Sequence, residues 1–99
     1  MESDKAKSQK RNKVLEYAQS LGYSVDENET GTFVKFTKEI IIEREKVCDI
    51  VIEHTKYNDC SDEYIYLTAD CTLFARETRE LANELNNAAS IAEKLDKLN

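Results

Sequence analysis

Glycine and histidine are scarce in this sequence. The two glycines, Gly22 and Gly31, are too few for a glycine-rich loop that cradles phosphates or for the nucleophile elbow of a hydrolase. The only histidine is His54. A Cys–His nucleophile pair also needs a third orienting group and an oxyanion hole, and no pattern here supplies them. We therefore expect that the protein is not an enzyme.

Cysteine is also infrequent. The three cysteines are odd in number and contain no close pair, so they do not outline a disulfide framework. With His54 they give the spacing C-x5-H-x5-C-x10-C over Cys48, Cys60 and Cys71. Cys48 and His54 fall on one expected strand, roughly 20 Å apart at about 3.3 Å per residue, too far to share a zinc ion. We expect no metal and no cofactor, with Cys48 in the core, Cys60 in a loop, Cys71 at a helix start and His54 exposed at a strand end.

Proline, tryptophan and long apolar runs are absent. No stretch approaches the roughly 20 apolar residues that span a bilayer, and the first five residues lack the apolar part of a secretory signal. We therefore expect a cytoplasmic protein with no membrane contact. A sequence without proline or tryptophan but rich in Lys, Glu, Ile and Asn is typical of AT-rich coding DNA, which favours a low-GC bacterium or its phage as the source.

Charge is abundant but unevenly distributed. The chain has 20 acidic and 14 basic side chains, for a net charge of −6. Residues 1–13 hold five basic groups and two acidic ones, so residues 14–99 hold nine basic and 18 acidic groups. Such an acidic body repels nucleic acid on average. The basic side chains that favour contact with phosphates are Lys5, Lys7, Lys10, Arg11 and Lys13.

The amino-terminal part predicts one helix over residues 4–21. Val14, Leu15, Ala18 and Leu21 recur at helical spacing, and Gly22 follows where a left-handed cap is favourable. The first two turns contain few apolar residues to offset the entropy of ordering. We therefore expect residues 1–9 to form a frayed basic arm.

The middle of the chain predicts strands. Residues 23–25 and 32–36 are β-prone runs separated by a polar turn, which indicates a hairpin. Residues 39–45 contain three consecutive isoleucines, which favour a strand, with a one-turn helix as the alternative. Residues 48–53 and 64–70 alternate between apolar and polar side chains, as strands with one buried face do. Helical periodicity begins near residue 72. The order α-β-β-β-β-α over residues 1–99 predicts one α+β domain: a two-layer structure with an antiparallel meander and both terminal helices on one face.

The expected carboxyl-terminal helix, residues 72–98, carries a narrow apolar seam formed by Leu81, Leu85, Ala88, Ala92 and Leu95. At about 1.5 Å per residue it is roughly 40 Å long, whereas a compact domain of this size is roughly 33 Å across. We therefore expect the helix to overhang its sheet. Three arrangements remain open: a break at Asn86–Asn87, packing along the first helix, or pairing of the seam with a second chain or another protein.

Tyr64 and Tyr66 lie on the same side of their expected strand, and Phe33 is a further aromatic candidate for that surface. Aromatic side chains on a sheet stack bases in single-strand binders, but that mechanism needs a positive groove. Cross-strand packing is the simpler interpretation; exposed tyrosines suit a protein-binding patch.

These features favour a small, acidic, non-enzymatic protein-binding module, such as an inhibitor or adaptor, with a homodimer as one arrangement. The expected contact residues are Tyr64, Tyr66, Leu85, Ala88, Ala92 and Leu95. The alternative is a nucleic-acid-associated protein that uses the basic arm.

Overall fold

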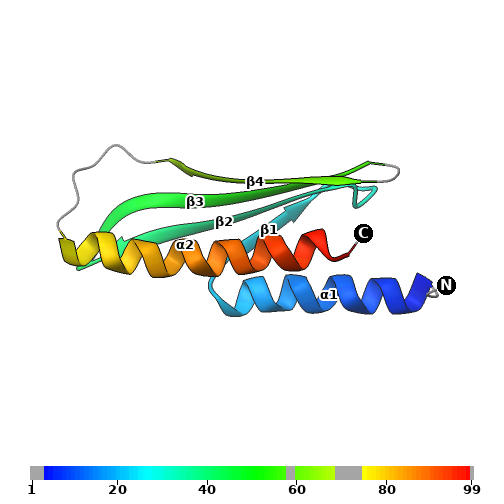
Figure 1. The fold of residues 1–99 in the computed structure, drawn as a ribbon, viewed down its shortest axis with the longest axis horizontal. Helices are drawn as coiled ribbons and strands as arrows, with labels where there is room; N and C mark the ends of the chain where they lie inside the picture. Colours follow the sequence, from blue (N-terminus) through cyan, green and yellow to red (C-terminus); the bar gives the residue numbers. More distant parts are fainter. Residues whose placement is uncertain (1–3, 58–59, 69–74, 99) are drawn as a thin grey trace.

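Four antiparallel strands and two helices form the protein (Figure 1). The computed structural model describes residues 4–57, 60–68 and 75–98. The elements follow the chain as α1 (Asp4–Ser20), β1 (Ser24–Glu27), β2 (Phe33–Ile42), β3 (Glu45–Lys56), β4 (Ser61–Thr68) and α2 (Ala75–Asp96). The strand order in the sheet is β1-β2-β3-β4, and each neighbouring pair is antiparallel. The predicted α+β meander is confirmed.

Both helices cover one face of the sheet, because a single buried cluster joins them to that face. From the sheet the cluster takes alternate residues such as Phe36, Ile50 and Ile52, and from the helices it takes Ala18 and Ile91. We call this covered side the inner face. The opposite side, the outer face, carries the intervening strand residues.

The carboxyl end of α1 is fixed by Gly22. Its φ of +93° lies in the left-handed region that glycine adopts freely. The Tyr23 amide donates a hydrogen bond to the Ala18 carbonyl and the Gly22 amide donates to the Gln19 carbonyl, which together form a Schellman cap. The predicted cap is thus confirmed. The helix itself begins at Asp4, although fraying of residues 1–9 stays a prediction.

The β2–β3 hairpin differs from the prediction for residues 39–45. This segment is neither one strand nor a helical turn: β2 ends at Ile42, and Glu43 and Arg44 form a two-residue turn before β3. Both turn residues have positive φ, 54° and 70°, as a type I′ turn requires. Residues 33–42 form one uninterrupted strand, with an irregular register between Ile40 and Ile41.

The molecule is elongated, which corrects the expectation that α2 overhangs the sheet. Its extents are 49 × 21 × 20 Å, because β2 and β3 are 10 and 12 residues long. A 22-residue α2, roughly 33 Å long, fits along them. The helix runs through Asn86 and Asn87 without a break. Residues 69–74, where we expected its start, lie outside the described residues.

The carboxyl half of α2 packs beside α1 (Figure 1). Tyr17 on α1 shares a hydrogen bond of 3.2 Å with Ser90 on α2, and the ammonium group of Lys94 lies 4.9 Å from the centre of the Tyr17 ring. Within the described residues, neither helix carries an apolar stretch long enough to cross a membrane.

Candidate protein-binding surface

The free edge of β4 carries the largest run of exposed apolar side chains in the described residues. Tyr64 is 59% exposed, Ile65 40%, Tyr66 39% and Leu67 42%. These four consecutive residues alternate between the two faces of the sheet, so apolar surface is open on both sides of the strand. We call the four residues the β4 patch.

On the outer face the patch consists of Tyr64 and Tyr66, as the sequence predicted for this strand. Tyr66 stands opposite Val51 in the register with β3, and Val51 is only 4% exposed although α1 and α2 both cover the opposite face. The Tyr66 hydroxyl donates a hydrogen bond of 2.8 Å to Glu53. This bond raises the pKa of Tyr66 above its usual value and fixes the ring in place. Phe33 lies on the same face, but the strand register does not place it level with Tyr64 or Tyr66.

On the inner face the patch consists of Ile65 and Leu67. Their direct cross-strand partners, Ile52 and Ile50, are fully buried. α2 contacts β4, yet Ile65 and Leu67 each remain about two fifths exposed. The sequence did not indicate these two residues as a binding surface, because alternation identifies the apolar face of a strand and does not reveal that the strand lies at an open edge.

The two edge strands of the sheet differ in how they are protected. β1 has four residues, two of them acidic, and it lies against α1. Short length, charge and a covering helix are the usual means by which proteins prevent edge pairing. β4 has eight residues in regular register with β3, and within the described residues no strand pairs with its other edge. Its middle contains no charge.

The charged side chains around the patch already have partners within the chain. Lys46 lies 3.0 Å from Asp49, and hydrogen bonding to that carboxylate raises the pKa of Lys46. Thr68 donates a hydrogen bond of 3.2 Å to the same carboxylate. At the start of the strand, the negative charge of Asp62 raises the pKa of Tyr57. The patch is therefore an apolar strip between charges that are largely satisfied internally.

His54 lies in the interior of the protein, so the exposed position expected from the sequence is wrong. It is 6% exposed on the inner face, and its Nδ1 lies 2.8 Å from Oε1 of Glu63. The Ser61 hydroxyl donates to the same Oε1, at 2.6 Å. A serine nucleophile needs its hydroxyl in contact with the imidazole base, whereas here the carboxylate lies between the two. This cluster therefore fits a satisfied buried polar group.

The seam of α2 is used inside the chain. Ala88 is fully buried, Leu95 is 1% exposed, and Leu85 and Ala92 pack against the same core. In this fold the first two have no surface to offer a partner. We therefore leave Ala88 and Leu95 out of the binding surface, in contrast to the expectation from the sequence. Leu85 and Ala92 are only partly buried, and partner binding through them stays a prediction.

Among the basic residues of the amino terminus, the structure describes the side chains of Lys10, Arg11 and Lys13. Arg11 forms an ion pair with Glu27 on β1, which neutralises its charge locally. Lys10 and Lys13 are exposed on α1, whereas the side chains of Lys5 and Lys7 lie outside the described residues. Nucleic-acid binding through this arm stays a prediction.

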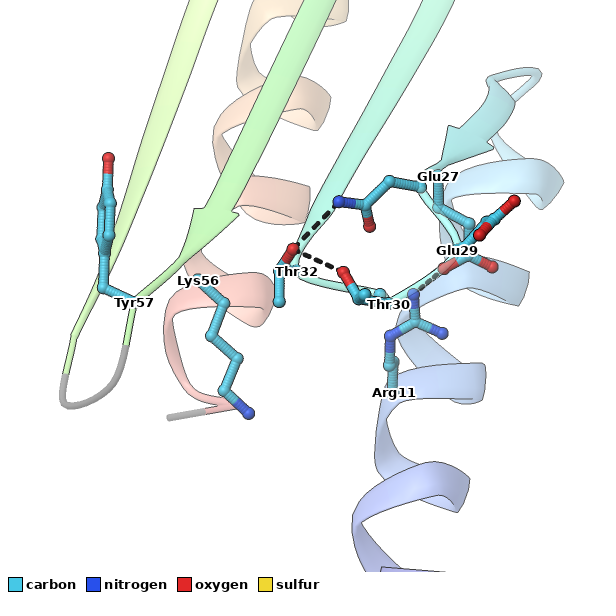
Figure 2. A pocket seen from close by; sticks show the side chains of 9 residues that line it. Arg11, Glu27, Glu29, Thr30, Thr32, Lys56 and Tyr57 are labelled. Carbon is cyan, nitrogen blue, oxygen red and sulfur yellow. Dashed lines mark hydrogen bonds and ion pairs between the residues drawn. The ribbon is translucent and has the colours of Figure 1, made fainter.

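A shallow hollow of about 670 Å³ lies at the end of the sheet, between the β1–β2 turn and α1 (Figure 2). Its polar groups bond one another: Asn28 donates a hydrogen bond of 2.9 Å to Thr32, and the hydroxyls of Thr30 and Thr32 lie 2.8 Å apart. In Figure 2 the Arg11 side chain points toward Glu27. This arrangement stabilises the turn and contains no pair of groups positioned for acid–base chemistry.

Among residues 4–57, 60–68 and 75–98, no three His, Cys, Asp or Glu side chains gather as a metal ion would require. Cys48 is buried and Cys60 is exposed; Cys71 lies outside the described residues. The chain matches no family model, no curated protein and no solved structure in the comparisons with known proteins.

Proposed function

We propose that the protein is a small, acidic, non-enzymatic binding module that holds an extended polypeptide segment against the free edge of β4. The β4 patch carries this proposal, because four consecutive residues of an edge strand are each at least 39% exposed. In strand addition, backbone hydrogen bonds provide affinity and alternate side-chain positions provide specificity. Tyr64 and Tyr66 would contact one face of the added strand, and Ile65 and Leu67 the other.

An inhibitor or adaptor in the cytoplasm of a bacterium or a phage-infected cell is the setting that we propose from the composition. An inhibitor and an adaptor both need an accessible surface, and neither needs catalytic residues. The net charge of −6 keeps such a protein soluble despite the apolar strip.

Selection of displayed random peptides on the purified protein tests this proposal. We expect the selected peptides to carry apolar residues at alternate positions, since they must match a strand. In hydrogen–deuterium exchange at a protein concentration of about 5 µM, where weak interfaces are dissociated, they should protect the amides of residues 61–68 and leave those of β1 unchanged.

A matched pair of lysine variants is the control. Ile65→Lys introduces a charge into the patch, whereas Gln19→Lys introduces the same charge on the exposed surface of α1. Peptide binding should be lost in the first variant and retained in the second. Peptides that bind Ile65→Lys as well as the unmodified protein, or that protect another segment, would contradict strand addition at β4.

A further inference from the structure

We infer that the strand bound at β4 is the β4 strand of a second copy of this chain, so that two four-stranded sheets join into one. This inference rests on the proposed function and names its partner. The two strands run antiparallel about a twofold axis at Ile65. Symmetric pairs of this kind are the commonest form of self-association in soluble proteins.

The sequence of β4 is complementary to itself in this arrangement. With the axis at Ile65, Ile65 faces its own copy on the inner face. On the outer face, Tyr64 of each chain faces Tyr66 of the other, and aromatic cross-strand pairs are favourable. The exposed parts of the inner-face side chains, Ile65 and Leu67, of both copies then form one continuous apolar strip.

Charge selects the antiparallel direction. Asp62 and Glu63 stand at the start of β4, and a parallel pair would set each beside its own copy, where like charges destabilise the pairing. In the antiparallel pair Asp62 faces Thr68 of the other chain and Glu63 faces Leu67. Glu63 is moreover turned toward His54 and Ser61 of its own chain, which leaves the inner-face strip free of an unpaired charge.

The exposed area of the patch indicates a weak, reversible dimer. A fully buried aromatic side chain covers roughly 150–250 Å², so the exposed fractions of the four residues correspond to about 350 Å² per copy. The roughly 700 Å² that a pair buries is less than the ~1,200 Å² of stable complexes. Two bodies of charge −6 also repel one another, so added salt should strengthen the dimer. Binding to a basic partner would weaken with salt instead.

Sedimentation equilibrium of the full chain tests this inference. Protein from about 5 to about 500 µM covers the range in which interfaces of this size dissociate, and salt from roughly 50 to 500 mM varies the screening. We expect a monomer–dimer equilibrium that tightens with salt. Ile65→Lys should raise the dissociation constant at least tenfold, and Gln19→Lys should leave the dimer intact. A chain that remains monomeric at the highest concentration, or an Ile65→Lys variant that dimerises normally, would overturn the inference.

Disulfide cross-linking tests the register without relying on a disruptive variant. In a background with Cys60 and Cys71 replaced by serine, Ile65→Cys places two thiols opposite each other on the axis. Ser61→Cys instead places the two thiols eight residues apart along the paired strands, which is a distance of roughly 26 Å. We expect mild oxidation to cross-link Ile65→Cys rapidly and Ser61→Cys at the rate of unassociated chains. Preferential cross-linking at position 61 would overturn the antiparallel pairing.

These experiments give different outcomes for a failure of the homodimer and for a failure of strand addition. If the chain is monomeric while a selected peptide protects the amides of β4, the homodimer is wrong and strand addition stands. If the chain dimerises through β4 while no selected peptide protects β4 at about 5 µM, where the weak dimer is dissociated, the homodimer stands and capture of other polypeptides is wrong. If the chain is monomeric and no peptide protects β4, strand addition itself is wrong.

Discussion

Replacement of Tyr23 by phenylalanine is expected to stabilise the protein. Tyr23 is 3% exposed, and its hydroxyl is buried without a hydrogen-bond partner among the described residues. A buried polar group that makes no hydrogen bond costs about 1–3 kcal/mol. Loss of one oxygen atom leaves a small cavity, which costs a few tenths of a kcal/mol at about 24 cal/mol per Å³. We therefore expect Tyr23→Phe to raise the free energy of unfolding by about 1 kcal/mol.

The pKa of Tyr23 determines how this gain in the free energy of unfolding depends on pH. Burial, followed by the nearby charges of Glu84 and Cys48, raises the pKa of Tyr23 from 10.0 to about 12. Between these two values the folded protein retains a proton that the unfolded chain has released, so stability falls as the pH rises. The loss is about 1 kcal/mol per pH unit. Phenylalanine has no such proton, so the advantage of Tyr23→Phe should grow between pH 10 and pH 12.

Urea unfolding followed by far-UV circular dichroism at pH 7 and at about pH 11, between the two pKa values, measures both effects. Tyr17→Phe is the matched control, because the Tyr17 hydroxyl has a partner in Ser90 at 3.2 Å; we expect that variant to lose about 0.5–1 kcal/mol. Destabilisation by Tyr23→Phe at pH 7, or an advantage that stays constant with pH, would refute the reasoning.

Three further variants test the packing, the inner-face ion pair and the tight turn. Ala88→Leu overfills the core at a fully buried position and should cost about 1–3 kcal/mol in thermal unfolding, whereas Ala82→Leu, at an exposed position on the same helix, should change little. Lys38 and Glu84 lie 2.8 Å apart with side chains 22% and 26% exposed, so a double-mutant cycle with Lys38→Met and Glu84→Gln should give a coupling energy of about 1 kcal/mol; a value near zero would contradict a role for this pair. Arg44→Gly should stabilise the protein by about 1 kcal/mol in urea unfolding, because Arg44 holds a φ of 70° that costs an L-residue about that much, and no gain would show that this turn is unstrained.

The regular parts of the fold were predictable because the spacing of apolar residues in the sequence agrees with which side chains are buried in the structure. Alternation predicted strands over residues 48–53, which lie in β3, and over residues 64–70, of which 64–68 lie in β4 and the rest lie outside the described residues. Gly22 identified the end of α1. The turn at Glu43 and Arg44 was not predictable, since neither residue belongs to the Asn, Asp and Gly types that type I′ turns favour. Its geometry is imposed by the long strands on either side.

The candidate site was predictable only on one face of β4. Tyr64 and Tyr66 are polar-tipped residues at positions that alternation assigns to the outer face. Polar residues on the inner face were not recognised, because Lys38 and His54 are satisfied by Glu84 and Glu63, which the sequence alone does not bring near them. The overhang of α2 was a wrong expectation because it assumed a spherical domain.

The pairing of Tyr17 with Ser90 has a consequence for the order of folding. Every strand of the meander pairs with its neighbour along the chain, so the sheet can assemble through short loops, which close quickly. The contact between α1 and α2 instead joins residues 73 positions apart, and the entropic cost of closing a loop grows with its length. The amino-terminal helix is therefore expected to dock last, onto a sheet and a second helix that have already formed.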